Sequence, residues 1–300
     1  MMIVSADVQQ MRSTPVELLP LKIRRYFYAL DTDDFREIRL RAGGAVCVCS
    51  GSGKRYISKY GKLTESVKGA VTVSPNDIEE AVDILTLSSL YSAQDEIKNG
   101  FITARGGHRV GLCGRMTSGG DFVTDITGLN YRFAREVIGA ADMAAEAVFN
   151  NGNIKSTLIV SSPGCGKTTF LRDLIRQISD KGVNVSVVDE RGEIGAVHNG
   201  MPAFDLGANT DIFDMCGKTE GMKLMIRSMS PQVVAVDEIG DEEDISAIRA
   251  AARSGVSVFA TIHASDWRKD IGKELTACFK CVISLSDRHG PGTVEELVYV

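Results

Sequence analysis

A glycine-rich run between two ordered segments is the clearest sign of chemistry in this sequence. Ser161-Ser-Pro-Gly-Cys-Gly-Lys-Thr-Thr169 follows the apolar run Thr157–Val160 and precedes a helical pattern. Glycines let the backbone N–H groups of such a turn converge on phosphate oxygens, and the helix adds its positive end. The run therefore predicts a P-loop that binds ATP. The residues expected to contact the nucleotide are Ser162, Pro163, Gly164, Cys165, Gly166, Lys167, Thr168 and Thr169.

Two side chains of this loop have separate expected roles. Lys167 is expected to reach the β- and γ-phosphates, and the hydroxyl of Thr168 is expected to ligate Mg²⁺. The usual pattern G-x-x-x-x-G-K-[ST] has glycine where this chain has Ser161, so Pro163 and Gly164 must shape the loop. The alternative is a glycine turn with a solvent-facing lysine, which the flanking strand and helix disfavour.

Carboxylates follow a second apolar run, Val233–Val236. In open α/β sheets, ligands bind at the carboxyl ends of the strands. Asp237 at that position is expected to hold Mg²⁺, and Glu238 to orient or deprotonate the attacking water. The alternative is a pair of solvated acids, which is less attractive beside a P-loop.

Two more strand ends carry polar side chains. The run Asn184–Val188 is followed by Asp189-Glu-Arg-Gly-Glu193, so Glu190 or Glu193 could polarise the water in place of Glu238. His263 ends another apolar run. Its position suggests a γ-phosphate sensor, although a lone histidine can equally be structural.

The two halves of the chain have different patterns. Residues 1–150 contain short strand-like runs with glycine turns and a helix that begins at Ser74-Pro75, which predicts a small α+β domain. Residues 151–300 alternate apolar strands with helices, which predicts a doubly wound α/β domain. Asn150–Asn153 is the expected linker. The strands expected in the second half are Thr157–Val160, Asn184–Val188, Val233–Val236, Val256–Thr261 and Cys281–Leu285, and the helices are Thr168–Ser179, Met222–Met229 and Glu242–Ser254.

Composition narrows the functional classes. The 300 residues carry a net charge of −5, so no global basic field attracts nucleic acid or anionic membrane. Met1–Pro20 lacks the pattern of a signal peptide, and no apolar run is long enough to span a bilayer, so we expect a cytoplasmic protein without direct membrane insertion. Seven scattered cysteines do not suggest a disulfide framework, and Cys278 and Cys281 are expected to be buried thiols rather than a zinc site.

These motifs resemble those of the secretion ATPases of type II and type IV secretion and pilus systems. Ser230–Asp241 resembles the Walker B segment of that family, Thr261–His263 its His box, and Val188–Ile194 the Asp box of its type IV branch. Thr127–Arg135 resembles the segment that enters the core, where arginines face the nucleotide. The chain departs from the family in having Asp237 where glycine is usual and Gly240 where arginine is usual, which leaves one arginine of the family unaccounted for.

The resemblance implies a RecA-like core in a homohexameric ring, with ATP between subunits and Arg132 or Arg135 near the γ-phosphate. For each arginine the alternative is a surface ion pair with an acid. The order and spacing of the motifs are most similar to a branch from endospore-forming bacteria. That similarity implies a motor that acts on membrane-channel proteins of the sporulation apparatus, between mother cell and forespore, and lies at the membrane through those partners.

Two other functions remain open from the residues. A RecA-like translocase would bind nucleic acid through its arginines, but the negative net charge and the few aromatic residues nearby disfavour it. A GTP switch would fit the D-x-x-G string Asp237–Gly240, but no guanine-reading N-K-x-D motif follows it.

Overall fold

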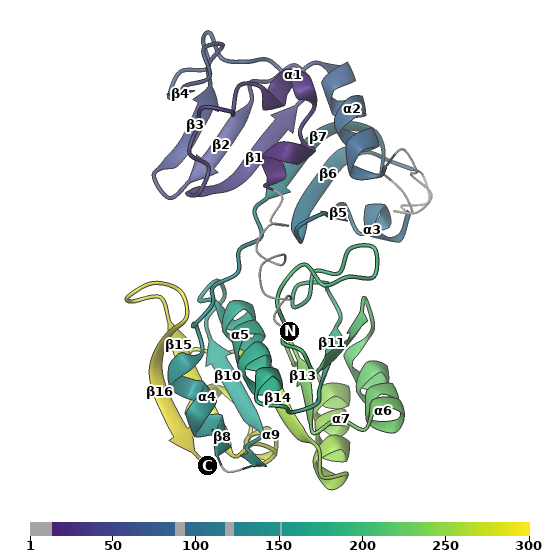
Figure 1. Ribbon diagram of the computed structural model, residues 1–300, viewed down its shortest axis with the longest axis vertical. Helices are drawn as coiled ribbons and strands as arrows, with labels where there is room; N and C mark the ends of the chain where they lie inside the picture. The colour runs from purple at the N-terminus through teal and green to yellow at the C-terminus, as the bar shows by residue number, and fades with distance from the viewer. Residues whose placement is uncertain (1–13, 88–93, 118–122, 151) are drawn as a thin grey trace, which may run out of the picture. The chain divides into compact units, whose positions relative to one another are not determined.

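The computed structural model describes residues 14–87, 94–117, 123–150 and 152–300 (Figure 1). The chain divides into two compact units, Met1–Arg135 and Glu136–Val300. The expected boundary at residue 150 is therefore too late. Helix α4 (Asp142–Val148) packs its alanines on the helix of the P-loop, and the expected linker instead joins the strands β8 (Phe149–Asn150) and β9 (Asn153–Ile154).

The first unit is built on an antiparallel sheet in the order β4-β3-β2-β1-β7-β6-β5. Its short strands agree with the strand-like runs expected of this half of the chain. In order, the elements are η2 (Pro15–Leu18), α1 (Leu21–Arg24), β1 (Phe35–Arg41), β2 (Cys47–Ser50), β3 (Gly53–Ile57), β4 (Leu63–Thr64), α2 (Pro75–Leu85), α3 (Gln94–Lys98), β5 (Phe101–Ala104), β6 (His108–Met116) and β7 (Val123–Arg132).

Alternation along the strands of this sheet separates a core from polar positions. On β1, Ile38 and Leu40 are fully buried, whereas Arg39 is half-buried and Arg41 is exposed. The buried side chains pack with Ile78 of α2 in one apolar cluster. Because successive strand residues point to opposite faces, this pattern places α2 on the face that bears Ile38 and Leu40.

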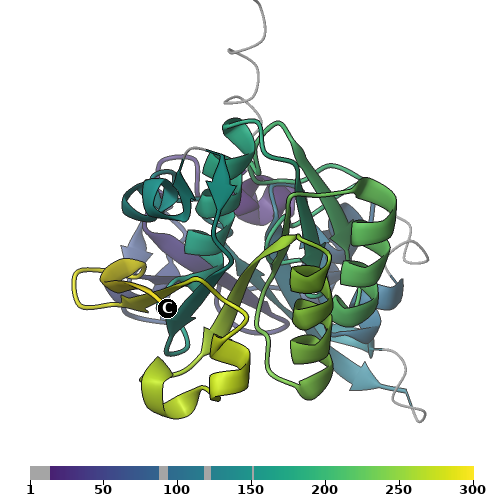
Figure 2. The ribbon, with the colours of Figure 1, turned by 90° about the horizontal axis from the view of Figure 1, so that it is seen from below.

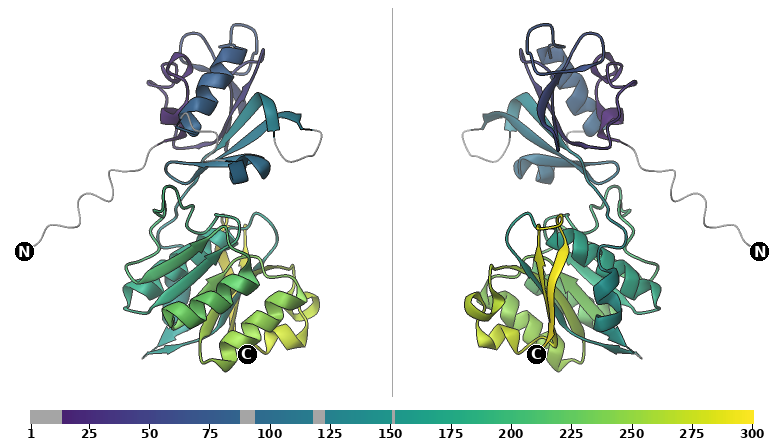
Figure 3. Two further views of the ribbon diagram at one scale, coloured as in Figure 1. Left: turned by 90° about the vertical axis from the view of Figure 1, so that its right-hand side faces the viewer. Right: turned by 90° about the vertical axis from the view of Figure 1, so that its left-hand side faces the viewer.

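The second unit is a twisted sheet with helices on both faces. The strand order is β12-β11-β13-β14-β10-β15-β16, parallel except for β16, and Figure 3 shows the β15–β16 hairpin at one edge. The elements that follow β9 are β10 (Thr157–Ser161), α5 (Lys167–Asp180), β11 (Val185–Asp189), β12 (Thr210–Asp214), α6 (Lys218–Met229), β13 (Val233–Val236), α7 (Glu242–Arg253), β14 (Ser257–His263), α8 (Trp267–Asp270), α9 (Lys273–Thr276), β15 (Cys281–Ser286) and β16 (Thr293–Tyr299).

Burial on both faces explains why these strands have almost continuous apolar sequences. Alternate residues enter two separate cores, as on β10, where Ile159 packs towards α4 and α5 while Leu158 packs towards α6 and α7. Figure 2 shows α6 and α7 side by side. Each expected strand and helix of the second half coincides with an observed element to within a few residues, so those predictions are confirmed.

Strand order decides what meets at the carboxyl edge of this sheet. Strand β10 leads into the P-loop, and strand β13 is followed by Asp237 and Glu238. The two strands are not neighbours, because β14 pairs in parallel with both of them. The residue that ends β14, His263, is therefore flanked by the P-loop on one side and by Asp237 and Glu238 on the other.

Within the described residues, no helix has both the length and the apolar composition of a membrane span. Cys281 is buried on β15, and that burial raises the pKa of its thiol to about 11. The expectation of buried thiols is confirmed for Cys281, whereas Cys278 is only half-buried.

Helix α2 begins with a reciprocal capping box. Ser74 accepts a hydrogen bond from the Asp77 N–H, and the Asp77 carboxylate accepts one from the Ser74 N–H at 2.7 Å. Lys22 also pairs with Asp77 at 3.1 Å. Burial alone would raise the pKa of Asp77, but the Ser74 hydrogen bonds and the Lys22 charge outweigh it and leave this pKa below its usual value.

We expect Asp77→Asn to lower the free energy of unfolding at neutral pH by about 1 kcal/mol, because it removes a charged cap and an ion pair. A lowered folded-state pKa stabilises above the unfolded-state pKa, near 4, and this stability is lost as the pH falls through the folded-state value. The difference between variant and wild type should therefore shrink in acid. Urea unfolding across that pH range measures it, with exposed Asp83→Asn as the control; a difference that stays constant down to the lowest pH contradicts the prediction.

Candidate functional site

The loop between β10 and α5 has the conformation expected of a P-loop. Gly164 and Gly166 have φ of 79° and 86°, in the left-handed region that disfavours other residues. A Cβ on Gly166 would also lie 3.0 Å from the backbone N of Gly292, in the turn of the β15–β16 hairpin. The Gly292 N–H donates to the Cys165 carbonyl at 2.8 Å. The hairpin turn thus supports the loop from outside.

Ser161 shows why glycine is not needed at the start of this loop. It is the last residue of β10 and is 3% exposed, and it is not among the residues of positive φ. Its hydroxyl donates to the Ser162 carbonyl at 2.9 Å. A small side chain that can satisfy itself locally therefore replaces the expected glycine without strain.

Lys167 lies at the centre of the site and is only 5% exposed. Its Nζ is 2.8 Å from Nδ1 of His263, and Nε2 of His263 is 3.0 Å from Oε1 of Glu238. Because an ammonium can only donate, Nδ1 accepts and Nε2–H donates, which fixes one neutral tautomer. Burial lowers the pKa of Lys167, while the charges of Asp237 and Glu238 oppose that change.

Asp237, which follows β13, is hydrogen-bonded to the first turn of α5. Its Oδ2 accepts a hydrogen bond from the Thr168 hydroxyl at 2.6 Å, and its Oδ1 accepts one from the Thr261 hydroxyl. Thr261 Oγ1 in turn accepts the Glu238 N–H at 2.9 Å. A hydroxyl and a carboxylate at this separation supply the oxygen ligands that Mg²⁺ prefers, so the residues fit the expected metal.

Two buried charges hold the loop that follows β11. The carboxylate of Asp189, 1% exposed, accepts the N–H groups of Glu193, Ile194 and Gly195 at 2.8–2.9 Å. Arg172 of α5 donates to the carbonyls of Glu193 and Ile194 at 2.7 and 2.8 Å, and its guanidinium lies 3.7 Å from the ring centroid of Phe204. Residues 189–195 are thus fixed to the P-loop helix.

Asp189 and Arg172 together form a clamp on this loop, and burial shifts the pKa of both side chains. It lowers the pKa of Arg172 to about 10, which leaves the guanidinium charged at neutral pH. It raises the pKa of Asp189 above its usual value even though three N–H groups favour the carboxylate. Asp189 therefore has a structural task, and the acids beside it are the ones that remain available for chemistry.

The charged side chains of this loop have different partners. Glu190 is exposed and pairs with Lys218 at 2.6 Å. Arg191 pairs with Oε2 of Glu238. Glu193 is half-buried, and its backbone is held by Asp189 and Arg172. The loop therefore brings Arg191, rather than a second acid, into direct contact with Glu238.

The candidate arginines of the first unit differ from each other. Arg135 donates to the backbone carbonyls of Asp33 and Phe35, the latter at 3.0 Å, which gives it a local structural task. Arg132 is exposed at the end of β7, opposite Glu37 of β1 and Arg109 of β6. Both side chains are exposed, so the two arginines are distinguished by the backbone hydrogen bonds of Arg135.

Several residues of this site were not singled out by their sequence pattern. Arg191 lies within the acidic string that resembles the Asp box, where the acids drew attention. Arg172 lies one helical turn after Thr168 and Thr169, and nothing in its sequence context distinguishes it from other helix residues. Thr261 and Gly292 act through contacts between distant segments. Of these four residues, only Arg191 could have been found from the sequence, because it is a cation among acids at the end of a strand.

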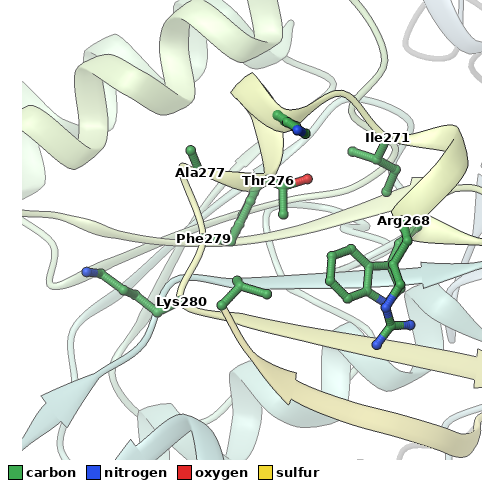
Figure 4. A pocket seen from close by; sticks show the side chains of 9 residues that line it. Arg268, Ile271, Thr276, Ala277, Phe279 and Lys280 are labelled. Atoms are coloured by element: carbon green, nitrogen blue, oxygen red, sulfur yellow. The ribbon is translucent and has the colours of Figure 1, made fainter.

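A separate hollow of about 410 Å³ lies beside α8 and α9 (Figure 4). Ile271 and Phe279 form a buried apolar part of its lining, and Arg268 lies at its side. Arg268 is already paired with Glu296 at 2.7 Å and stacked on Trp267. None of the lining residues belongs to the P-loop or to the acidic strand ends.

Comparison with known proteins identifies the family. Residues 9–299 match the family described as sporulation stage III, protein AA. Stage III sporulation protein AA of Bacillus subtilis (strain 168) is 41% identical over 224 residues, which cover 70% of this chain and 72% of that protein. The chain belongs to the sporulation stage III protein AA family. An uncharacterised protein, ycf45 of Cyanidium caldarium, is 29% identical over 51% of this chain and 45% of its own length.

Solved structures of other proteins share the fold of this chain. The pilus retraction motor PilT with bound ADP matches with a TM-score of 0.59 and 16% identity, covering 88% of this chain and 77% of that chain. The ATPase DotB of Legionella pneumophila matches with a TM-score of 0.57 and 15% identity, covering 89% and 76%. The expected RecA-like α/β core is therefore confirmed.

Proposed function

We propose that this protein binds ATP with Mg²⁺ and hydrolyses the γ-phosphoanhydride bond. The observation that carries the proposal is the line of contacts from Lys167 through His263 to Glu238, beside the Thr168–Asp237 pair. A buried cation, a metal-type oxygen pair and a candidate base thus meet at the carboxyl edge of one sheet. That combination is what phosphoryl transfer to water requires.

Each residue has a distinct role in the proposed reaction. The P-loop N–H groups and Lys167 bind the phosphates. Thr168 and Asp237 would hold Mg²⁺, which would supply positive charge beside the phosphates. Glu238 orients the attacking water and accepts its proton. His263 fixes the positions of Lys167 and Glu238 relative to each other, because one ring nitrogen contacts Lys167 and the other contacts Glu238. Arg191 orients the Glu238 carboxylate by pairing with its Oε2.

The family membership and the secretion-ATPase fold support a mechanical output. We propose that the protein is a homohexameric motor, that the first unit contributes to gating and assembly, and that ATP turnover drives a secretion-like channel of the sporulation apparatus. The motor would act from the cytoplasm of the mother cell, on membrane-embedded partners. Co-purification from sporulating cells tests this step, since membrane-channel proteins should be recovered with the tagged chain.

The rival functions differ in their ligands. A nucleic-acid translocase would show hydrolysis that DNA or RNA stimulates, with a steep dependence on salt. A GTP switch would prefer GTP over ATP in competition binding. Preference for ATP, together with hydrolysis that nucleic acid leaves unchanged, supports the motor.

We expect Lys167→Ala to abolish ATP hydrolysis and to weaken nucleotide binding strongly, because the variant loses the buried cation that faces the phosphates. The measurements are phosphate release and titration with a fluorescent ATP analogue. Lys181→Ala is the matched control, since Lys181 is exposed at the far end of the same helix. Hydrolysis by pure Lys167→Ala at the wild-type rate would refute the proposed function.

Glu238→Gln is expected to bind ATP but not turn it over, because the amide keeps the shape and loses the base. Glu190→Gln should retain most activity, since Glu190 pairs with Lys218 and not with the catalytic line. Single-turnover hydrolysis with bound-nucleotide analysis distinguishes the two variants. If Glu190→Gln stops turnover while Glu238→Gln does not, the base lies on the loop after β11.

Arg132→Ala is expected to lower kcat by about 10³-fold while ATP affinity changes little, as for an arginine that stabilises transition-state charge. Arg135→Ala should instead lower the melting temperature, because its guanidinium holds two backbone carbonyls. Arg115→Ala is the control, since that side chain is 77% exposed. If Arg132 acts on ATP bound to a neighbouring subunit, wild-type turnover per subunit should rise with protein concentration. An unchanged kcat in Arg132→Ala, together with turnover that does not depend on concentration, would exclude this role.

A further inference from the structure

A basic hairpin stands out on the first unit. It consists of residues 53–69, in which β3 turns back into the edge strand β4 (Figure 1). The segment carries five cations and a single acid, Glu65, within a chain whose net charge is −5. Glu65 is paired with Arg55 at 3.2 Å. The four lysines of the basic hairpin are all exposed: Lys54, Lys59, Lys62 and Lys68.

Large apolar side chains project from the same hairpin. Tyr60 at its turn is 90% exposed, Val67 is 57% exposed and Leu63 is 41% exposed. Each of them is next to a lysine in the sequence. Single exposed apolar residues are common, but three within eight positions, surrounded by lysines, form a mixed cationic and apolar surface.

The turn that carries Tyr60 is held against the body of the unit. Gly61 has φ of 68°, and a Cβ there would lie 3.1 Å from the Tyr26 carbonyl oxygen. This close approach places the turn beside residues 25–28, where Tyr28 is 69% exposed and Arg25 is exposed. The neighbouring segment therefore extends the surface with another aromatic ring and another cation.

We propose that the basic hairpin, with Arg25 and Tyr28, docks this protein directly on a bilayer rich in anionic phospholipids. Lysine and arginine side chains are drawn to the negative surface potential of such a bilayer. Tyrosine rings settle at the depth of the headgroups, where the ring is in an apolar layer and the hydroxyl reaches water. Leu63 and Val67 gain by leaving water at the same boundary.

The apolar side chains favour a bilayer over nucleic acid. Lysines alone would suit a phosphate backbone, and tyrosines could stack on bases. Exposed aliphatic side chains such as Leu63 and Val67 have no comparable partner on a nucleic acid. The surface lies in the first unit and uses none of the proposed ATP-site residues, so this inference stands independently of the proposed function.

The test is co-sedimentation of the full chain with vesicles of phosphatidylcholine alone or mixed with phosphatidylglycerol. The wild type should bind only the mixed vesicles, and added salt should weaken binding, because exposed charges are screened. Lys59→Glu with Lys62→Glu should reduce partitioning by about tenfold or more, since each basic side chain near the surface contributes. Tyr60→Ala should reduce it severalfold, and Tyr60→Phe should retain most of it.

A charge-matched control comes from the second unit. Lys223→Glu with Lys273→Glu removes two exposed lysines from α6 and α9 and should leave vesicle binding unchanged. Equal melting temperatures show that the variants are folded. The proposal is overturned if the wild type does not bind mixed vesicles, if it binds neutral vesicles equally, or if the hairpin variant binds like the control. Loss of single-stranded RNA binding in the hairpin variant, without any vesicle binding by the wild type, would assign the surface to nucleic acid instead.

Discussion

The desolvated charge of Lys167 is the constraint on which the site depends. An ammonium that is 5% exposed is costly unless other groups replace the water it has lost. Here His263 accepts from it directly, and the carboxylates of Asp237 and Glu238 supply negative charge nearby. These three residues come from two strands, β13 and β14. The order of the strands in the sheet is therefore what makes a buried lysine tolerable at the start of α5.

The same order explains the central position of His263. With β14 inserted between β10 and β13, a side chain at the end of β14 is within reach of both flanking strands. A histidine fits this place better than an acid or an amine, because its two ring nitrogens accept from Lys167 and donate to Glu238. Thr261, two residues earlier and on the same face, holds Asp237 and the Glu238 N–H in the same way.

Local pattern was enough to predict the strands and the glycine turn between β10 and α5, because continuous apolar runs and glycine spacing are local signals. The boundary between the units was misplaced because α4, with Ala144 and Ala145, is recognisable as part of the second core only once it is seen against α5. The clamp of Arg172 and Asp189 was equally hidden. Its atoms meet only after a helix and a strand loop, about 20 residues apart, have packed together. The positions after apolar strands supplied the candidate acids, but not the contacts that separate Glu238 from Glu190.

The clamp also accounts for how the loop after β11 can carry charges without losing its shape. Residues 190–195 have no strand or helix to satisfy their backbone groups, so Asp189 takes three N–H groups and Arg172 takes two carbonyls. Buried backbone groups of a loop must find such partners or unfold towards water. Because Arg172 belongs to the helix that begins at Lys167, a shift of the P-loop helix must move this loop as well. Arg191 would then change its distance from Glu238. The geometry thus links the segment proposed to bind phosphate to the carboxylate proposed to activate water, through the loop backbone that Asp189 and Arg172 hold.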